Sequence, residues 1–152
     1  MALYVTVSPT STMVYNNDNT QNSFYFDAVD AVVSGYPGGV FGGHAPPLNL
    51  AGTEDAYLTV QALGGYKATD PTQPIDLRFK VNGNVLEILQ VPRWTSHFII
   101  MPVMRIVRIP LGILRLGGRA DGLPPNVKNN LLVVESVDPM DYFFIGPAVC
   151  QY

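Results

Sequence analysis

The sequence has few charged residues and only one cysteine. Lys, Arg, Asp and Glu together make up 14% of its 152 residues, whereas an average soluble domain has roughly 25%. Because the formal net charge is −3, we expect no nucleic-acid partner. The single cysteine, Cys150, excludes an internal disulfide and a zinc site built from several cysteines. It lies in an apolar run, which predicts a buried thiol.

The sequence also lacks a segment typical of a membrane span or a secretory signal. The most apolar region, 97–116, is interrupted by prolines and arginines, so it falls short of the roughly 20 uninterrupted apolar residues that a transmembrane helix needs. Residues 1–7 contain no Lys or Arg, so we expect no signal peptide. The compartment stays open, and an extracellular or virion-associated location is among the alternatives.

Helical periodicity is nearly absent. The 14 glycines and 13 prolines cut the chain into short pieces, and no window of a dozen residues keeps an apolar helical face. Short alternating or apolar segments between turn residues indicate strands instead, about nine or ten of them. We therefore predict an all-β fold, a two-sheet antiparallel β-sandwich, as a single domain over 1–152. Besides the two strands of a hairpin over 75–90, the expected strands are 2–7, 12–15, 23–27, 56–63, 98–101 continuing into 104–109 with a bend at Pro102, 131–137, 142–145 and 148–151.

The hairpin has the clearest signal, because Asn82-Gly83 separates two alternating runs and suits a type I′ turn with positive φ at both positions. A regular two-residue turn places apolar side chains on one face and a charged pair on the other. The expected cross-strand pairs are Val81 with Asn84, Phe79 with Leu86, Leu77 with Ile88, and Arg78 with Glu87.

The order of motifs after this hairpin resembles the galactose-binding-domain-like jelly rolls, the sandwich used by many carbohydrate-binding modules. In that superfamily a strand–Asn-Gly–strand hairpin precedes an Ile-Pro-x-Gly-x-Leu-Arg-x-Gly turn, an Asn-x-Leu strand and a closing Asp-x-Phe/Tyr strand. Here these motifs correspond to Asn82-Gly83, 109–117, 129–135 and 141–145. The resemblance covers about residues 57–152.

The sequence departs from this pattern in two places. A long insertion, 117–130, stands where a short turn is expected, and the Gly- and Pro-rich stretch 34–52 corresponds to no part of the family pattern. The resemblance implies a jelly-roll fold, with non-catalytic binding of a glycan or another partner as its commonest use. It does not transfer a ligand specificity, because fold does not fix function.

Two sets of residues are candidates for a site. An aromatic platform with a polar neighbour suits glycan binding, and the loop-borne Trp94, Tyr66 and Arg93 are the candidate ligand-binding residues. Modules of the resembling type often carry a structural calcium, which carboxylates hold; Asp138, Asp141 and Asp27 are the candidate ligands. The alternative interpretations are aromatic rings that close the core and aspartates that cap turns.

Catalysis is not expected. The two histidines, His44 and His97, are the only imidazole bases, and Ser96 beside His97 would point to the opposite face of a strand. We therefore predict a non-enzymatic binding or adhesion module with carbohydrate as the candidate ligand. The alternative is a structural subunit of a virion, filament or surface layer, because a surface so poor in charge is typical of self-association. A small β-barrel enzyme acting on an apolar substrate is the third interpretation.

Overall fold

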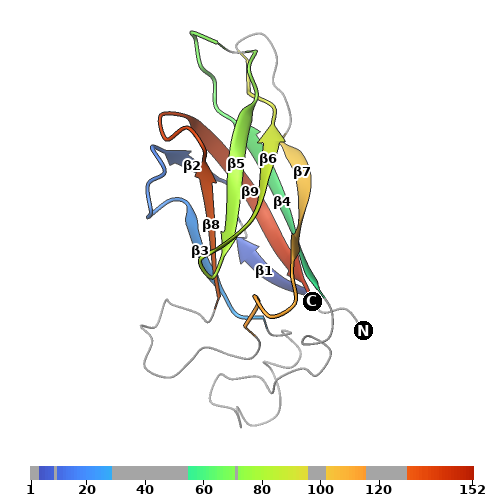
Figure 1. Ribbon diagram of the computed structural model, residues 1–152. Helices are drawn as coiled ribbons and strands as arrows, with labels where there is room; N and C mark the ends of the chain where they lie inside the picture. Colours follow the sequence, from blue (N-terminus) through green and yellow to red (C-terminus); the bar gives the residue numbers. More distant parts are fainter. Residues whose placement is uncertain (1–3, 9, 29–54, 71, 96–101, 116–129) are drawn as a thin grey trace.

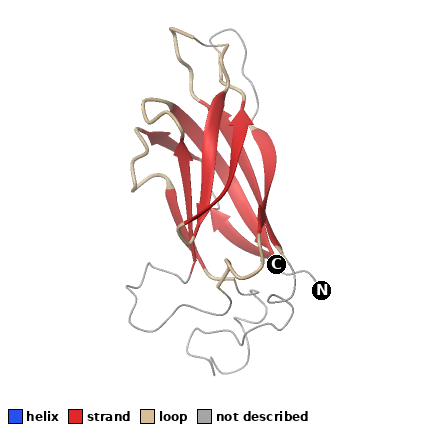
Figure 2. Cartoon of the chain, in the orientation of Figure 1, coloured by secondary structure: helices blue, strands red, loops and turns tan. Residues whose placement is uncertain are grey.

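The computed structural model describes residues 4–8, 10–28, 55–70, 72–95, 102–115 and 130–152. Within these ranges the chain forms nine strands and no helix (Figure 2). The described residues therefore contain no helix long and apolar enough to cross a membrane. The strands make two antiparallel sheets that pack face to face (Figure 1), which confirms the predicted all-β sandwich. They are β1 (Tyr4–Ser8), β2 (Thr12–Tyr15), β3 (Ser23–Phe26), β4 (Ala56–Gly64), β5 (Ile75–Val81), β6 (Asn84–Val91), β7 (Val103–Ile109), β8 (Asn130–Ser136) and β9 (Tyr142–Gln151).

Sheet A has the order β1-β9-β4-β7, with β2 beside β1 on the same edge of β9; sheet B has the order β3-β8-β5-β6. The segments predicted as two strands, 142–145 and 148–151, form the single strand β9 with an irregularity opposite Gln61. At one side of the sandwich β7 approaches β6. There the Arg105 guanidinium donates to the Gln90 carbonyl from Nη2 at 3.2 Å, which closes the gap between the sheets.

The core lies between the sheets, where alternate residues of the inner strands point. The largest side chains on the inner surfaces are fully buried, in accordance with the period of two along each strand. Burial of each one stabilises the fold by about 1.5–3 kcal/mol. This core includes Phe26, Leu58, Val60, Leu77, Phe79, Leu132, Phe143 and Ile145.

The β5–β6 hairpin is confirmed, but its predicted register is wrong beyond the turn. Asn82 and Gly83 have φ of 51° and 81°, and Val81 pairs with Asn84 as expected. A β-bulge then adds one residue to β6, so that Arg78 lies opposite Ile88. A bulge turns the side chains that follow it to the other face. Ile88 is accordingly 51% exposed on the outside of sheet B instead of packing in the core.

Three of the four sequence motifs that carry the resemblance, all but the closing 141–145 segment, meet at one end of the sandwich. The Asn82 amide donates to the Ile113 carbonyl at 2.8 Å and to Asn130 Oδ1 at 2.9 Å. The buried Asn130 in turn donates to the Arg115 carbonyl at 2.7 Å and accepts from its N–H at 2.8 Å. Asn82 Oδ1 accepts from the Leu131 N–H at 3.0 Å. Two asparagines distant in sequence thus hold the hairpin turn, the Pro-Gly segment and β8 together.

Several predictions concern residues outside the described ranges. They include the strand 98–101, the stretch 34–52, nearly all of the insertion 117–130 and both histidines, His44 and His97. The organisation of 1–152 as one domain also stays a prediction.

Candidate functional site

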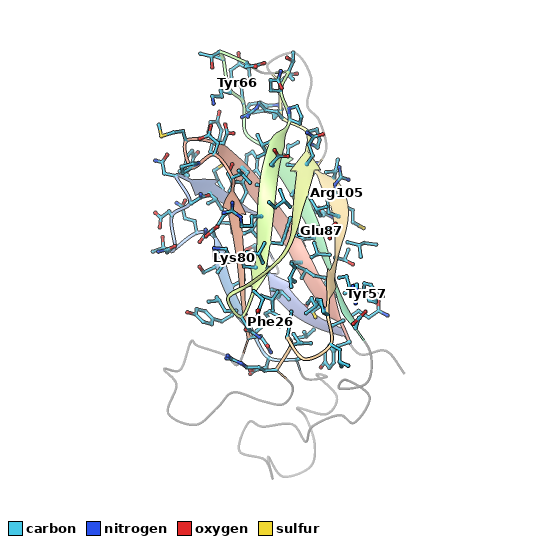
Figure 3. All side chains as sticks on the ribbon, in the orientation of Figure 1. Phe26, Tyr57, Tyr66, Lys80, Glu87 and Arg105 are labelled. Carbon is cyan, nitrogen blue, oxygen red and sulfur yellow. The ribbon has the colours of Figure 1, made fainter. Side chains whose placement is uncertain are left out.

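Two of the predicted site residues, Tyr66 and Trp94, lie side by side at one end of the sandwich. After β6 the chain crosses to the end of β4, where Gly64 donates to the Pro92 carbonyl at 2.7 Å and accepts from the Trp94 N–H at 2.9 Å. This short parallel pairing brings the Tyr66 and Trp94 rings into an edge-to-face arrangement with centroids 6.0 Å apart. Figure 3 shows Tyr66 at the far end from Phe26.

Arg93, between Trp94 and the end of β6, is buried and is part of the scaffold. Its side chain is 3% exposed, and all three of its nitrogens are hydrogen-bonded to the protein. Nε donates to the Gln73 carbonyl at 2.9 Å, Nη1 to the Gly65 carbonyl at 3.1 Å and Nη2 to Asp141 Oδ1 at 3.1 Å. Arg93 therefore joins the 65–74 loop to the turn before β9, and it supports the site from below instead of facing a ligand.

Lys67, which the sequence analysis did not single out, is a more exposed cation than Arg93 at this end of the sandwich. Its ammonium lies 3.3 Å from Asp141 Oδ1, and its side chain remains 39% exposed. Its position next to Tyr66 is the signal in the sequence that could have pointed to it, but the sequence does not reveal that Asp141 holds both cations. A partly exposed ammonium beside aromatic rings is a suitable hydrogen-bond donor for a polar ligand.

Two further aromatic residues extend this end of the molecule. The Tyr142 and Tyr15 rings are stacked with centroids 5.5 Å apart. Tyr142 also covers Gly65, where a Cβ atom would lie 2.0 Å from the ring. Burial raises the pKa of Tyr142, and the nearby hydroxyls of Tyr15 and Tyr66 raise it further. We call Tyr15, Tyr66, Trp94 and Tyr142 the aromatic cluster.

The three aspartates proposed as calcium ligands are not brought together. Asp138 closes the turn before β9: its Oδ1 accepts from the Met140 N–H at 3.0 Å, and its carbonyl accepts from the Asp141 N–H at 3.0 Å. Asp141 already binds two cationic side chains. Asp27 follows β3 at the opposite end, separated by the length of β8, on the order of 20 Å. Among the described residues no group of three His, Cys, Asp or Glu side chains could hold a metal ion.

Cys150 is buried, as predicted. Burial raises the pKa of its thiol to about 12, so it is protonated at neutral pH and is a poor nucleophile.

The outward surfaces of the two sheets differ in charge. Outward residues of sheet A, which we call outer face A, lie in register across the strands; they are Thr6, Met13, Tyr15, Tyr57, Thr59, Gln61, Met104, Ile106, Arg108, Tyr142, Phe144, Val149 and Gln151. Arg108 is the only charged side chain that the described strands place on this face, and Asp55 pairs with it. The outside of sheet B carries four charged residues, which are Asp76, Arg78, Lys80 and Glu135.

Comparison with known proteins adds no family. No protein-family model matches this sequence, and no curated protein matches it significantly. The function must therefore be argued from the residues of this chain.

Proposed function

We propose that this protein is a non-catalytic binding module that binds a glycan through the aromatic cluster. The observation that carries the proposal is the Tyr66–Trp94 ring pair. It lies at the end of the sandwich where β4 and β6 finish, next to the buried ion pair of Arg93 and Asp141. Trp94 is 38% exposed. In an edge-to-face pair each ring keeps at least one face that its partner does not cover, so a flat apolar surface of a ligand can stack there.

The chemistry of the rim suits a neutral, hydroxyl-rich ligand. A pyranose presents C–H groups on its faces and hydroxyls at its edge, and aromatic residues with few polar donors match this pattern. The half-exposed Lys67 ammonium is such a donor. Because Arg93 fixes the loops that carry both rings, little conformational entropy would be lost on binding.

We also propose that the sandwich is a jelly roll of the galactose-binding-domain-like type. The strand order supports this: from β2 to β9, consecutive strands lie in alternate sheets except for the β5–β6 hairpin. Double-sheet jelly rolls are used by lectin domains and by viral capsids. The hydrogen-bonded asparagines Asn82 and Asn130 lie at the motif positions that suggested the family.

The proposal that the protein is not an enzyme depends on sequence arguments. Both candidate bases, His44 and His97, lie outside the described residues. Among the described residues, the Cys150 thiol is a candidate nucleophile. Its raised pKa disfavours the thiolate, which is the reactive form.

A glycan array followed by titration tests the glycan proposal directly. Trp94 is the only tryptophan of the chain, so its fluorescence reports on the site itself. We expect the full chain to bind at least one glycan, with a change in Trp94 emission, and Trp94→Ala to weaken binding at least tenfold. That factor corresponds to about 1.4 kcal/mol.

Tyr25→Ala is the matched control, because Tyr25 is 39% exposed and lies on β3 on the outside of sheet B. Its glycan affinity should equal that of the wild type. Absence of binding to every glycan, or equal losses in the two variants, would contradict the proposal.

The second candidate function is a structural subunit of a larger assembly, such as a virion, filament or surface layer. The observation that favours it is outer face A, which is broad and has a single, paired charge. Depletion of charge is typical of the buried centre of a protein interface.

A further inference from the structure

The side chains of outer face A combine exposure with low polarity. Ile106 is 62% exposed, Met104 59%, Tyr15 50%, Tyr57 43% and Val149 36%. Ile106 and Val149 both flank Thr59 in the register of the sheet, so uncharged side chains continue from β7 across β4 to β9, with Thr59 and Gln61 as the polar groups on β4. Exposed apolar side chains gathered on one face mark an association site.

The charge distribution favours a second copy of this chain as the partner. In a twofold-symmetric dimer the same patch supplies both sides, so any unpaired charge on it would face its own kind. Outer face A avoids this cost, because the Arg108 guanidinium is hydrogen-bonded to the Asp55 carboxylate of the same molecule. A strongly charged partner would find no complementary group there, whereas a neutral face matches itself.

The area of the face reaches the lower limit of biological interfaces. The five strands of sheet A together contain 35 residues, and each strand residue occupies about 3.3 Å by 4.8 Å, so the flat area is roughly 550 Å². Stable interfaces bury about 800 Å² of accessible surface per partner, and biological ones exceed about 500 Å². Two such sheets can stack about 10 Å apart, as sheets do inside a sandwich.

We propose that two copies of this protein associate face to face through outer face A, with Ile106, Thr59 and Val149 near the centre of the contact. This inference goes beyond glycan binding, and it gives the structural-subunit candidate a specific first contact.

Sedimentation equilibrium of the full chain tests it with a pair of matched variants. Ile106→Lys places a charge on outer face A of both copies, and Ile88→Lys makes the same change on the outside of sheet B, where Ile88 is 51% exposed. We expect the wild type and Ile88→Lys to form the same dimer, and Ile106→Lys to dissociate at least tenfold more readily. Met104→Lys should reproduce the loss, which guards against a folding defect peculiar to one site.

Three results would overturn the inference. The first is a wild type that stays monomeric at about 1 mM, a concentration at which even a contact worth ~4 kcal/mol would be half occupied. The second is an Ile106→Lys variant that dimerises like the wild type. The third is an equal effect of Ile106→Lys and Ile88→Lys on the dimer. The glycan proposal is tested separately, because Trp94→Ala should weaken glycan binding at least tenfold and leave the dimer intact. Folding of each variant is checked by circular dichroism.

Discussion

Replacement of Arg93 by methionine is the sharpest test of how the aromatic end is built. The substitution keeps most of the side-chain volume and removes the guanidinium. Three hydrogen bonds disappear, and two carbonyls, those of Gln73 and Gly65, lose their donors. Asp141 keeps Lys67 at 3.3 Å but loses its buried partner.

The expected cost follows from the burial of the pair. Removal of one partner of a buried ion pair costs about 3–5 kcal/mol, since it leaves the other charge uncompensated. Lys67 still contacts the Asp141 carboxylate, so we expect the lower end, about 3 kcal/mol. A domain of this length loses about 2–4 °C of Tm per kcal/mol, so Tm should fall by roughly 6–12 °C.

Urea unfolding of Arg93→Met, Asp141→Asn and the double variant measures this coupling. The double variant no longer has a stranded charge, so the two single costs should fail to add by about 1–3 kcal/mol. Exposed ion pairs contribute less than about 1 kcal/mol. A cost in that range for Arg93→Met would refute the view that Arg93 holds the loops of the site in place.

Three other predictions concern the scaffold. Asn130→Ala removes three buried hydrogen bonds and should lower the free energy of unfolding in urea by about 2–4 kcal/mol. The control Asn84→Ala, at an exposed position, should lower it by less than about 0.5 kcal/mol, and equal losses would contradict the role of the asparagine pair. Gly65→Ala would place a methyl group 2.0 Å from the Tyr142 ring, so we expect the free energy of unfolding to fall by about 1–3 kcal/mol. The near-ultraviolet circular dichroism spectrum should also change, and an unchanged spectrum would show that the ring does not pack against Gly65. The Cys150 thiol has an ordinary pKa of 9.0 and a folded pKa of about 12, so the unfolded chain releases its proton first. Its contribution to stability should be complete below pH 9 and should decline from pH 9 to 12, and Cys150→Ala should remove this part of the decline. Alkylation of the native protein at pH 7 should be slower than alkylation of the unfolded chain, and equal rates would contradict the burial of the thiol.

The sequence predicted those features whose causes are local. A type I′ turn requires positive φ at two successive residues, and Asn82-Gly83 meets that need whatever surrounds it. Alternation of apolar residues likewise identified the buried side of β4 and β5. These signals are sufficient for an all-β sandwich, because regular strands such as β4 and β5 show in their own sequence which face they bury.

The features that the sequence could not predict depend on contacts between distant segments. The bulge in β6 moves Ile88 to the outside, and no turn residue marks its position. Arg93 has the same appearance in sequence whether it faces a ligand or the Gly65 carbonyl. Its burial follows from the crossing of the chain from β6 to Gly64, a parallel contact without a motif of its own.

The two proposed surfaces share residues, and this links their geometry. Tyr15 and Tyr142 belong both to the aromatic cluster and to outer face A. If the twofold axis of the dimer runs along the strands, both aromatic ends point the same way and a glycan-coated surface is bound bivalently, with a gain in apparent affinity. If the axis runs across the strands, the two ends point in opposite directions and the dimer joins separate glycans. The Tyr66–Trp94 ring pair lies outside outer face A, so a glycan that stacks on this pair is bound equally well by the wild type and by Ile106→Lys when it is free in solution. The bivalent arrangement would give the wild type the stronger binding to a dense glycan surface. The crossed arrangement would instead let the wild type, but not the variant, agglutinate glycan-coated particles.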